Sequence, residues 1–211
     1  MRQVAHFSIR ICAEASQIPR IQIPLRDLYS CADAELEVRR ACLSEKRFGM
    51  EVKMDEHDMI VNLKNIEYRE PEDGNLRIKR AFAGDKETIL RFVRENFSES
   101  WTAEAECAIL QMPSQCFIAT EQGRVLGFAC YDVSAKGFFG PIGVLESERR
   151  RQIGKYLLLK TLDAMRSVGY GYAIIGWVSE AEGFYRRTVH AEAIPDSAPK
   201  DSVYSNLVRM P

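Results

Sequence analysis

The segment that most constrains the fold is ERRRQIGKYLLLKTLDAMRSVGY, residues 148–170, which has the pattern of a long amphipathic helix. Gly169 is placed to end this helix, as glycine often does at a helix C-terminus. Strand-type segments flank it, GFFGPIGV at 137–144 and the continuous apolar run YAIIGWV at 172–178. The apolar side of the helix carries Ile153, Leu157, Leu158, Leu162 and Met165. Such a helix between two strands predicts an α/β protein.

The rest of the C-terminal two thirds continues this succession of strand and helix patterns. The other predicted elements are a strand at 76–82, helices at 86–97 and 102–112, two strands within 116–133 joined at Gln122 and Gly123, a helix at 180–189 and a last strand around 203–210. Asp85 is expected to cap the N-terminus of the first helix with its side chain. This order predicts a mixed sheet with helices on both faces.

A polar, turn-rich stretch, EYREPEDGN at residues 67–75, suggests a domain boundary. We expect a small α/β module of unknown role at residues 1–75 and a second domain at 76–211. In the first module, strands are predicted at 7–11, 50–55 and 59–63, and a helix at 32–48. The module contains no recognisable catalytic constellation, so its candidate roles are interaction, homodimer formation or capping of the acceptor site.

Charge and hydropathy exclude several partners. The chain has 29 Lys and Arg residues and 30 Asp and Glu residues, and the two signs are interspersed along the sequence. The protein therefore has no strong positive electrostatic field that would concentrate nucleic acid or anionic lipid. No apolar run reaches the roughly 18 residues needed to span a bilayer, and the N-terminus lacks a secretory leader. We therefore expect a cytoplasmic protein with neither nucleic-acid nor membrane partners.

Cysteine and histidine usage argues against a metal site. The six cysteines lie among apolar neighbours without a C-x-x-C pair, as small buried hydrophobic residues do, and the three histidines lie in unrelated segments. These residues are Cys12, Cys31, Cys42, Cys107, Cys116 and Cys130, and His6, His57 and His190. No metal is expected.

The junction GFFGPIGVLESERRRQIGKYLLL has the features of an anion site. The first turn of a helix has backbone N–H groups without partners and a partial positive charge, both of which a phosphate can satisfy. Gly154 would let a phosphate approach the backbone, and Arg149, Arg150 and Arg151 would add charge. The alternative is a solvated helix start, although cations at that end oppose the helix dipole.

At this junction the sequence resembles the GNAT superfamily of N-acetyltransferases, whose cofactor motif runs from a strand through Arg/Gln-x-x-Gly-x-Gly/Ala into a helix. The match starts at Arg149 and continues through Ile153 and Gly154, but Gln152 stands where the family usually has its first glycine. The segment 172–178 corresponds to the family's next strand, and AEGFYRRTV to its following helix with a Phe-Tyr pair. The resemblance covers the chain from Leu76 onward and implies the GNAT fold.

The resemblance also implies a function and a set of site residues. The expected reaction transfers an acetyl group from acetyl-CoA to the amine of an unidentified small-molecule or peptide acceptor. Tyr185, in the Phe-Tyr pair, would be the general acid that protonates the departing thiolate. The cofactor-binding residues would be Ile142, Gly143, Val144, Arg149, Arg150, Arg151, Gln152, Ile153, Gly154 and Lys155.

Two points stay open at the level of sequence. The general base is unassigned, with Asp132, Glu146 and water-relayed proton loss as the candidates. The absence of a carboxylate from GFFGPIGV, together with Gln152, also permits a protein that binds acyl-CoA as a sensor without turning it over.

Overall fold

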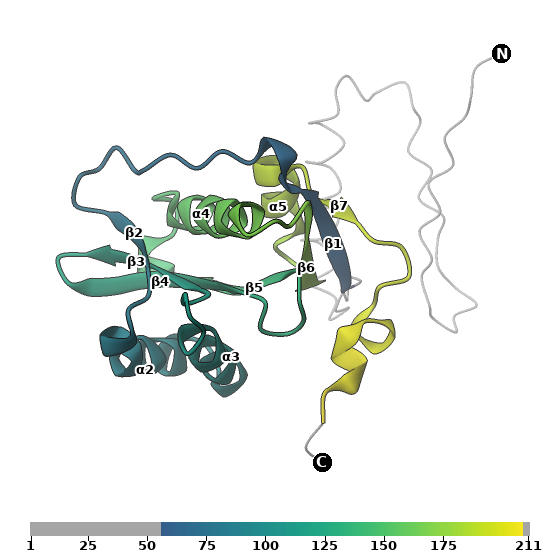
Figure 1. Ribbon diagram of the computed structural model, residues 1–211, viewed down its shortest axis with the longest axis horizontal. Helices are drawn as coiled ribbons and strands as arrows, with labels where there is room; N and C mark the ends of the chain where they lie inside the picture. The colour runs from purple at the N-terminus through teal and green to yellow at the C-terminus, as the bar shows by residue number, and fades with distance from the viewer. Residues whose placement is uncertain (1–55, 209–211) are drawn as a thin grey trace, which may run out of the picture. The chain divides into compact units, whose positions relative to one another are not determined.

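The described part of the chain forms a seven-stranded mixed sheet with helices on both faces (Figure 1). The computed structural model describes residues 56–208. Its strand order is β2-β3-β4-β5-β6-β1-β7, and neighbouring strands are antiparallel except for the parallel pair β5 and β6. This confirms the predicted mixed sheet.

The strands and helices follow the predicted order closely. The strands are β1 (His57–Asn62), β2 (Arg77–Arg80), β3 (Cys116–Glu121), β4 (Arg124–Tyr131), β5 (Phe138–Val144), β6 (Tyr172–Val178) and β7 (Glu192–Ala193). The helices are α2 (Lys86–Asn96), α3 (Glu99–Ile109), α4 (Ile153–Ser167) and α5 (Glu182–Val189). Helices α2 and α3 cover one face of the sheet, and α4 and α5 lie on the other (Figure 1).

Each face of the sheet has its own hydrophobic core. The apolar side of α4, with Leu157, Leu158 and Leu162, packs on the sheet together with residues of β1 and β6. On the opposite face α2 and α3 pack around Phe128. Because β4 is covered on both sides, its residues from Leu126 to Tyr131 are all buried. None of the helices between residues 56 and 208 is long and apolar enough to cross a bilayer.

The β3–β4 hairpin turns where the sequence predicts. Gln122 and Gly123 both have positive φ angles, 48° and 77°. Two such residues match the twist of the adjoining antiparallel strands, which is why glycine is favoured in this type of turn.

Two helix starts differ from the sequence prediction. The Asp85 side chain does not cap α2, because it is paired with the Lys79 ammonium at 3.0 Å. Helix α3 begins earlier than predicted, since the Ser98 side chain accepts a hydrogen bond from the Trp101 N–H and caps it there.

The strand predicted around 203–210 is wrong. Within residues 56–208 the last strand is instead β7, and residues Val203–Asn206 form a 3-10 turn, η6. In that turn Ser205 Oγ donates to the Ser202 carbonyl and Asn206 Nδ2 to the Val203 carbonyl. Side chains that bond to nearby backbone in this way compete with strand pairing.

The strand predicted at 59–63 belongs to the main sheet. It is β1, which lies between β6 and β7 and pairs with both in antiparallel register. The same compact unit therefore contains residues on both sides of the stretch 67–75. The elements predicted at 7–11, 32–48 and 50–55 lie outside the described residues.

Candidate active site

A fork between β5 and β6 opens the sheet at its centre. The two strands are paired only at Phe138 with Ile174 and Phe139 with Ile175, and β5 then continues along β4 alone. The edge of β5 that faces β6 is therefore open from Gly140 to Val144.

The backbone groups of the open edge have a defined direction. Just after β5, the Leu145 N–H donates to the Leu126 carbonyl on β4 at 2.9 Å. Successive peptide groups of a strand point to alternate sides. The N–H groups of Val144 and Ile142 therefore point away from β4, into the fork.

Gly143 has a packing role at this strand. A Cβ atom there would come within 2.5 Å of the Phe97 ring, so only glycine lets this aromatic side chain lie against the strand. Pro141, which has no N–H to donate, lies just before it, where the β4–β5 register shifts.

The N-terminus of α4 lies just beyond the open edge. The helix begins at Ile153, so the three arginines precede it and do not form its first turn as the sequence analysis assumed. Gln152 is the N-cap residue, has a left-handed conformation with φ 58°, and makes no side-chain capping bond. The first intrahelical bond is from the Tyr156 N–H to the Gln152 carbonyl, which leaves the N–H groups of residues 153–155 free of intrahelical bonds.

Gly154 is not required by the packing of the protein. A Cβ atom at this position would lie 3.7 Å from Val144 and 3.8 Å from Phe184, both ordinary contacts. The space that the glycine leaves open therefore lies at the helix N-terminus, beside the open edge of β5.

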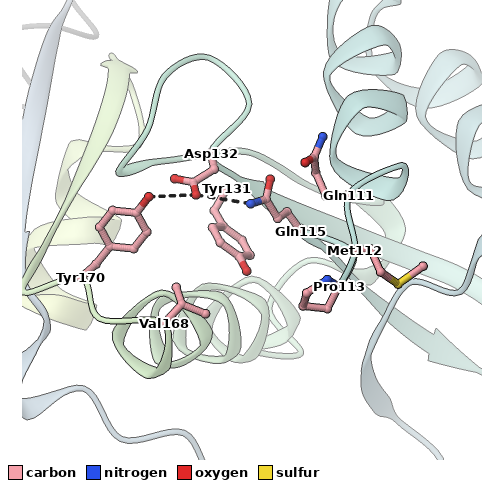
Figure 2. A pocket seen from close by; sticks show the side chains of 8 residues that line it. All are labelled: Gln111, Met112, Pro113, Gln115, Tyr131, Asp132, Val168 and Tyr170. Carbon is pink, nitrogen blue, oxygen red and sulfur yellow. Dashed lines mark hydrogen bonds between the residues drawn. The ribbon is translucent and has the colours of Figure 1, made fainter.

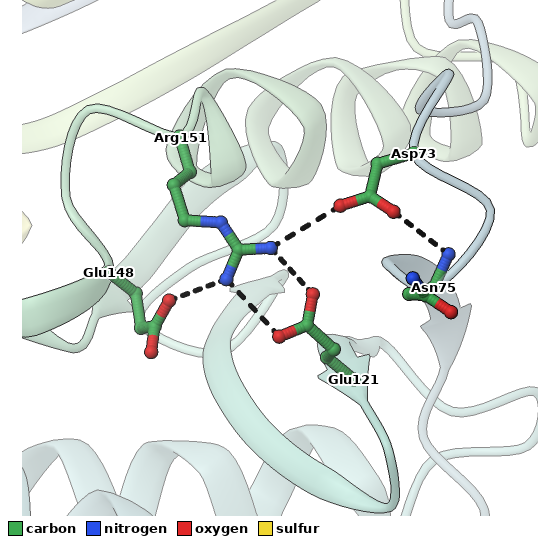
Figure 3. A network of polar contacts seen from close by, with 5 residues as sticks. All are labelled: Asp73, Asn75, Glu121, Glu148 and Arg151. Atoms are coloured by element: carbon green, nitrogen blue, oxygen red, sulfur yellow. Dashed lines mark hydrogen bonds and ion pairs between the residues drawn. The ribbon is translucent and has the colours of Figure 1, made fainter.

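Arg151 is held by three carboxylates (Figure 3). Its guanidinium lies 2.5 Å from Glu121, 2.6 Å from Glu148 and 3.5 Å from Asp73. The hydrogen bond from Arg151 holds the pKa of the Glu121 carboxyl below its usual value. Arg151 thus ties the loop before α4 to the β3–β4 hairpin and to the stretch 67–75.

The other polar residues of the loop are less constrained. Arg149 makes a 3.9 Å pair with the exposed Glu146, and within residues 56–208 Arg150 makes no ion pair. Lys155 and Gln152 are exposed, whereas the Ile153 side chain is buried, so that only its backbone can face a ligand.

Tyr185 lies on α5, on the same face of the sheet as α4 (Figure 1). Its ring contacts those of Phe139, at 6.4 Å between centroids, and Phe184, at 5.1 Å. Burial raises the pKa of the Tyr185 phenol, and the nearby Tyr204 phenol adds to the effect. Among residues 56–208 its hydroxyl has no hydrogen-bond partner, and its ring lies beside Phe139, the last β5 residue that pairs with β6.

The two carboxylates considered as general bases have other surroundings. Asp132 accepts from the Gly137 N–H at 2.7 Å and from the Tyr170 hydroxyl at 2.9 Å, and Gln115 and Lys136 also contact it. It thereby closes the loop before β5. Glu146 is 90% exposed. None of the contacts given for these two side chains is with a residue of the open edge.

Asp132 also borders a cavity of about 280 Å³ (Figure 2). Its carboxylate lies between the Tyr170 hydroxyl and the Gln115 amide, as the dashed lines show. The cavity is lined by Gln111, Met112, Pro113, Gln115, Tyr131, Asp132, Val168 and Tyr170. None of these residues belongs to the open edge or to α4.

A phenol that sequence reasoning missed lies at the fork. A Cβ atom on Gly176 would come within 2.1 Å of the Tyr204 hydroxyl oxygen, so this oxygen rests directly on the glycine. The Tyr204 ring also contacts Trp177 at 5.2 Å and Phe138 at 6.3 Å. Burial raises the pKa of Tyr204 to about 12. The only sequence signal was a glycine inside an apolar strand, which often marks a close approach by another group.

A second missed group is Glu104, on α3. Its carboxylate accepts a hydrogen bond of 2.8 Å from the Ser134 hydroxyl. Burial raises the pKa of the Glu104 carboxyl. In the part of the chain that the structure describes, no cluster of three or more His, Cys, Asp or Glu side chains could hold a metal ion.

Two solved structures, both with a TM-score of 0.54, support this fold. A GCN5-related glucosamine N-acetyltransferase region of a fungal multi-domain GH3 β-N-acetylglucosaminidase superposes with a TM-score of 0.54 and 18% identity, covering 75% of this chain and 22% of that one. A GCN5-related N-acetyltransferase from Sphaerobacter thermophilus superposes with a TM-score of 0.54 and 20% identity, covering 74% of this chain and 53% of that one. A GNAT family acetyltransferase from Brucella melitensis in complex with acetyl-CoA has a TM-score of 0.42 and 20% identity, covering 56% of this chain and 86% of that one. The chain thus spans about half or less of the first two proteins.

The family assignment rests on a match to the sequence itself. No curated protein matches the chain. Residues 83–190, just over half of the 211, match the model of the acetyltransferase (GNAT) family, a span that runs from before α2 to the end of α5. The chain therefore belongs to the acetyltransferase (GNAT) family.

Proposed function

We propose that this chain binds acetyl-CoA along the fork and transfers its acetyl group to an amine. One observation carries the proposal: the open edge of β5, with outward backbone groups at Ile142 and Val144, leads directly to an α4 N-terminus whose first N–H groups lack intrahelical partners. An extended amide-containing arm that ends in a diphosphate is complementary to this arrangement.

The residues present fit such a ligand. The backbone of Ile142 and Val144 would pair with the amides of the pantetheine arm, and the N–H groups of residues 153–155 would bind the diphosphate. Arg149, Arg150 and Lys155 would supply positive charge around it. Gly154 would keep the approach to the helix backbone clear, since no contact within the protein requires a glycine there.

The chemistry needs one proton removed and one supplied. When bound, acetyl-CoA supplies an acetyl group activated as a thioester. An alkylamine, with a pKa of about 10.4, is protonated at neutral pH and must lose that proton before it can attack. Tyr185 would hold a proton at its phenol oxygen for the sulfur that leaves, because its raised pKa keeps it protonated throughout the neutral range.

Two measurements on the full chain test the proposal. Calorimetry with acetyl-CoA and with CoA should show binding, and release of free thiol should be observed with at least one member of an amine panel that includes polyamines, amino sugars, amino acids and peptides. Binding without thiol release for any amine would favour the sensor alternative. No binding of either compound would overturn the proposal.

A further inference from the structure

Three aromatic side chains gather where β5 leaves β6. The centroid of the Tyr204 ring lies 5.2 Å from that of Trp177 and 6.3 Å from that of Phe138. Phe138 is the first residue of β5, and Trp177 lies just beyond Ile175, the last β6 residue that pairs with β5. Tyr204 comes from the distant η6 turn. We call these three residues, Phe138, Trp177 and Tyr204, the fork aromatics.

The fork aromatics lie on the face of the sheet that carries α2 and α3. Phe139 contacts Tyr185 on the face of α4 and α5, and neighbouring strand residues point to opposite faces. Phe138 and the Tyr204 ring against it are therefore on the other face. Figure 1 shows the η6 turn, in yellow, on that side as well. An acceptor that approaches along this face does not meet the α4 N-terminus, where the diphosphate is proposed to bind.

The fork aromatics belong to neither hydrophobic core. In the part of the chain that the structure describes, none of them is among the core residues or the side chains packed against the two cores. Phe138 and Tyr204 are half-buried, and Trp177 is 41% exposed. Grouped apolar side chains that remain in contact with water mark binding surfaces. Aromatic side chains in particular gain from stacking on a ligand ring beyond the burial of area.

The protein holds these rings in a fixed arrangement. Trp177 has a left-handed φ of 51°, which a bulky residue rarely adopts, and its N–H donates to the Asp58 carboxylate at 2.9 Å. Ser202 Oγ donates to the same carboxylate and anchors the segment that carries Tyr204. Gly176 lets the Tyr204 oxygen approach β6, since a Cβ atom there would lie 2.1 Å from it. Rings positioned in advance lose little freedom when a ligand binds.

Polar groups beside the fork aromatics are already used within the protein. Besides its bonds from Trp177 and Ser202, Asp58 donates its backbone N–H to Ser197 Oγ at 2.9 Å. Ser197 Oγ itself donates to the Ile194 carbonyl at 2.6 Å. A hydroxyl-rich acceptor such as an amino sugar needs several free partners in its site. The arrangement favours an acceptor whose body is apolar.

We propose that the fork aromatics bind the body of the acceptor, and that the acceptor is an arylalkylamine, a primary amine joined by a short chain to an aromatic ring. This inference rests on the proposed acetyl transfer and names its acceptor class. The short chain follows from the position of the rings, which adjoin the last β5–β6 pair. The ligand ring takes no part in the transfer. The amine nitrogen bonds to the acetyl carbon and loses a proton, while the C–S bond breaks and the sulfur gains one.

Matched amines test the acceptor class on the full chain. With acetyl-CoA, kcat/KM for 2-phenylethylamine should exceed that for ethylamine, which lacks only the ring, about 30-fold or more, because the ring is taken out of water and stacked. Each value is expressed per neutral amine, so that different amine pKa values do not enter. Glucosamine should also be a poorer acceptor than 2-phenylethylamine.

Variants of the fork aromatics should change ring recognition alone. Trp177→Ala should raise KM for 2-phenylethylamine about tenfold or more and keep kcat/KM for ethylamine and the Kd for acetyl-CoA within about twofold. Trp177→Phe should restore most of the loss, and Tyr204→Leu should repeat it without altering the irregular backbone at Trp177. The control is Phe82→Ala, which removes an aromatic side chain that is 75% exposed and outside the fork, and should change neither acceptor.

A binding measurement follows the ring without turnover. The chain has two tryptophans, Trp101 and Trp177. In the presence of CoA, which has no acetyl group to transfer, 2-phenylethylamine should change the tryptophan fluorescence of the wild type and of Trp101→Phe. The change should be lost in Trp177→Phe, and ethylamine should produce none.

The outcomes separate the two proposals. Thiol release with ethylamine or glucosamine at a kcat/KM equal to that for 2-phenylethylamine would overturn the acceptor class and leave the acetyl transfer intact. Fluorescence changes specific to Trp177, without thiol release from any amine, would overturn the transfer and leave the ring-binding role. Equal losses for 2-phenylethylamine and ethylamine in Trp177→Ala and Tyr204→Leu would make these residues structural and overturn that role. Neither thiol release nor a fluorescence change would overturn both proposals.

Discussion

The Asp58 carboxylate accepts a hydrogen bond of 2.9 Å from the backbone N–H of Trp177. Trp177 has a positive φ of 51°, and the β1–β6 register shifts beside it, so the carboxylate replaces a strand partner at an irregular point of the sheet. Ser202 Oγ donates to the same carboxylate. One buried side chain of β1 thereby fixes both the β6 strand at the fork and the segment that carries Tyr204.

Replacing Asp58 should therefore destabilise the domain. Asp58→Ala leaves the Trp177 N–H and the Ser202 hydroxyl without their acceptor, and a hydrogen bond to a charged group contributes about 1.5–3 kcal/mol. We expect the free energy of unfolding in urea to fall by about 2–3 kcal/mol. Asp163→Ala, which removes only a surface pair with Arg166, should cost less than about 1 kcal/mol. Equal losses in the two variants would contradict this role of Asp58.

The two arginines before α4 should differ in their effects. Arg151 is engaged by Glu121, Glu148 and Asp73, whereas Arg150 makes no ion pair within residues 56–208. Arg150→Gln should raise the Kd for CoA about tenfold, since a charge-assisted bond to a phosphate is lost, and should weaken its dependence on salt.

Arg151→Gln should instead lower the Tm and keep the Kd within about threefold, because its main partners are carboxylates of the protein. Calorimetry at two salt concentrations and thermal unfolding check both variants. A tenfold weaker binding of CoA by Arg151→Gln, without a change in Tm, would assign it to the phosphate site instead.

Local patterns were enough to predict most of the elements. The Gln122-Gly123 turn has the backbone geometry that its residues favour, and α4 has the apolar side that the sequence indicates. The family motif around Gly154 was also visible, because the spacing of a strand, a loop and a helix is local in the sequence. By contrast, the sequence placed the start of α4 a few residues before Ile153, because the left-handed conformation of Gln152 has no sequence signature.

The remaining features depend on contacts between distant segments. Asp58 and Trp177 are 119 residues apart, and no pattern in either strand announces their hydrogen bond. Tyr204 lies in a segment whose local pattern wrongly predicts a strand, and its place is fixed instead by contacts at Gly176 and Ser202. The separation of β5 from β6 requires knowledge of the whole sheet order, which the order of elements alone does not determine.

Gly154→Ala should separate the stability of the protein from binding of the cofactor. Its Cβ atom would make only ordinary contacts within the protein, and alanine favours a helix over glycine by up to about 1 kcal/mol. The Tm should therefore stay the same or rise. The Kd for CoA should rise about tenfold or more, because the methyl group would occupy the approach to the helix N–H groups. A variant with unchanged affinity would place the diphosphate elsewhere.

Tyr185→Phe should lower kcat by about ten- to a thousandfold and leave the affinity for CoA nearly unchanged, since only the proton donor is lost.

The same substitution should also change how the stability of the protein depends on pH. Burial raises the pKa of Tyr185, so above pH 10 the unfolded chain releases this proton while the folded chain keeps it. The free energy of unfolding of the wild type should therefore fall as the pH rises above 10, and the fall should be smaller in Tyr185→Phe. Urea unfolding between pH 8 and 11, with the exposed Tyr172→Phe as the control, measures the difference. Full activity in Tyr185→Phe would remove this phenol from the reaction, whereas equal alkaline destabilisation in both variants would show that Tyr185 ionises like an exposed phenol.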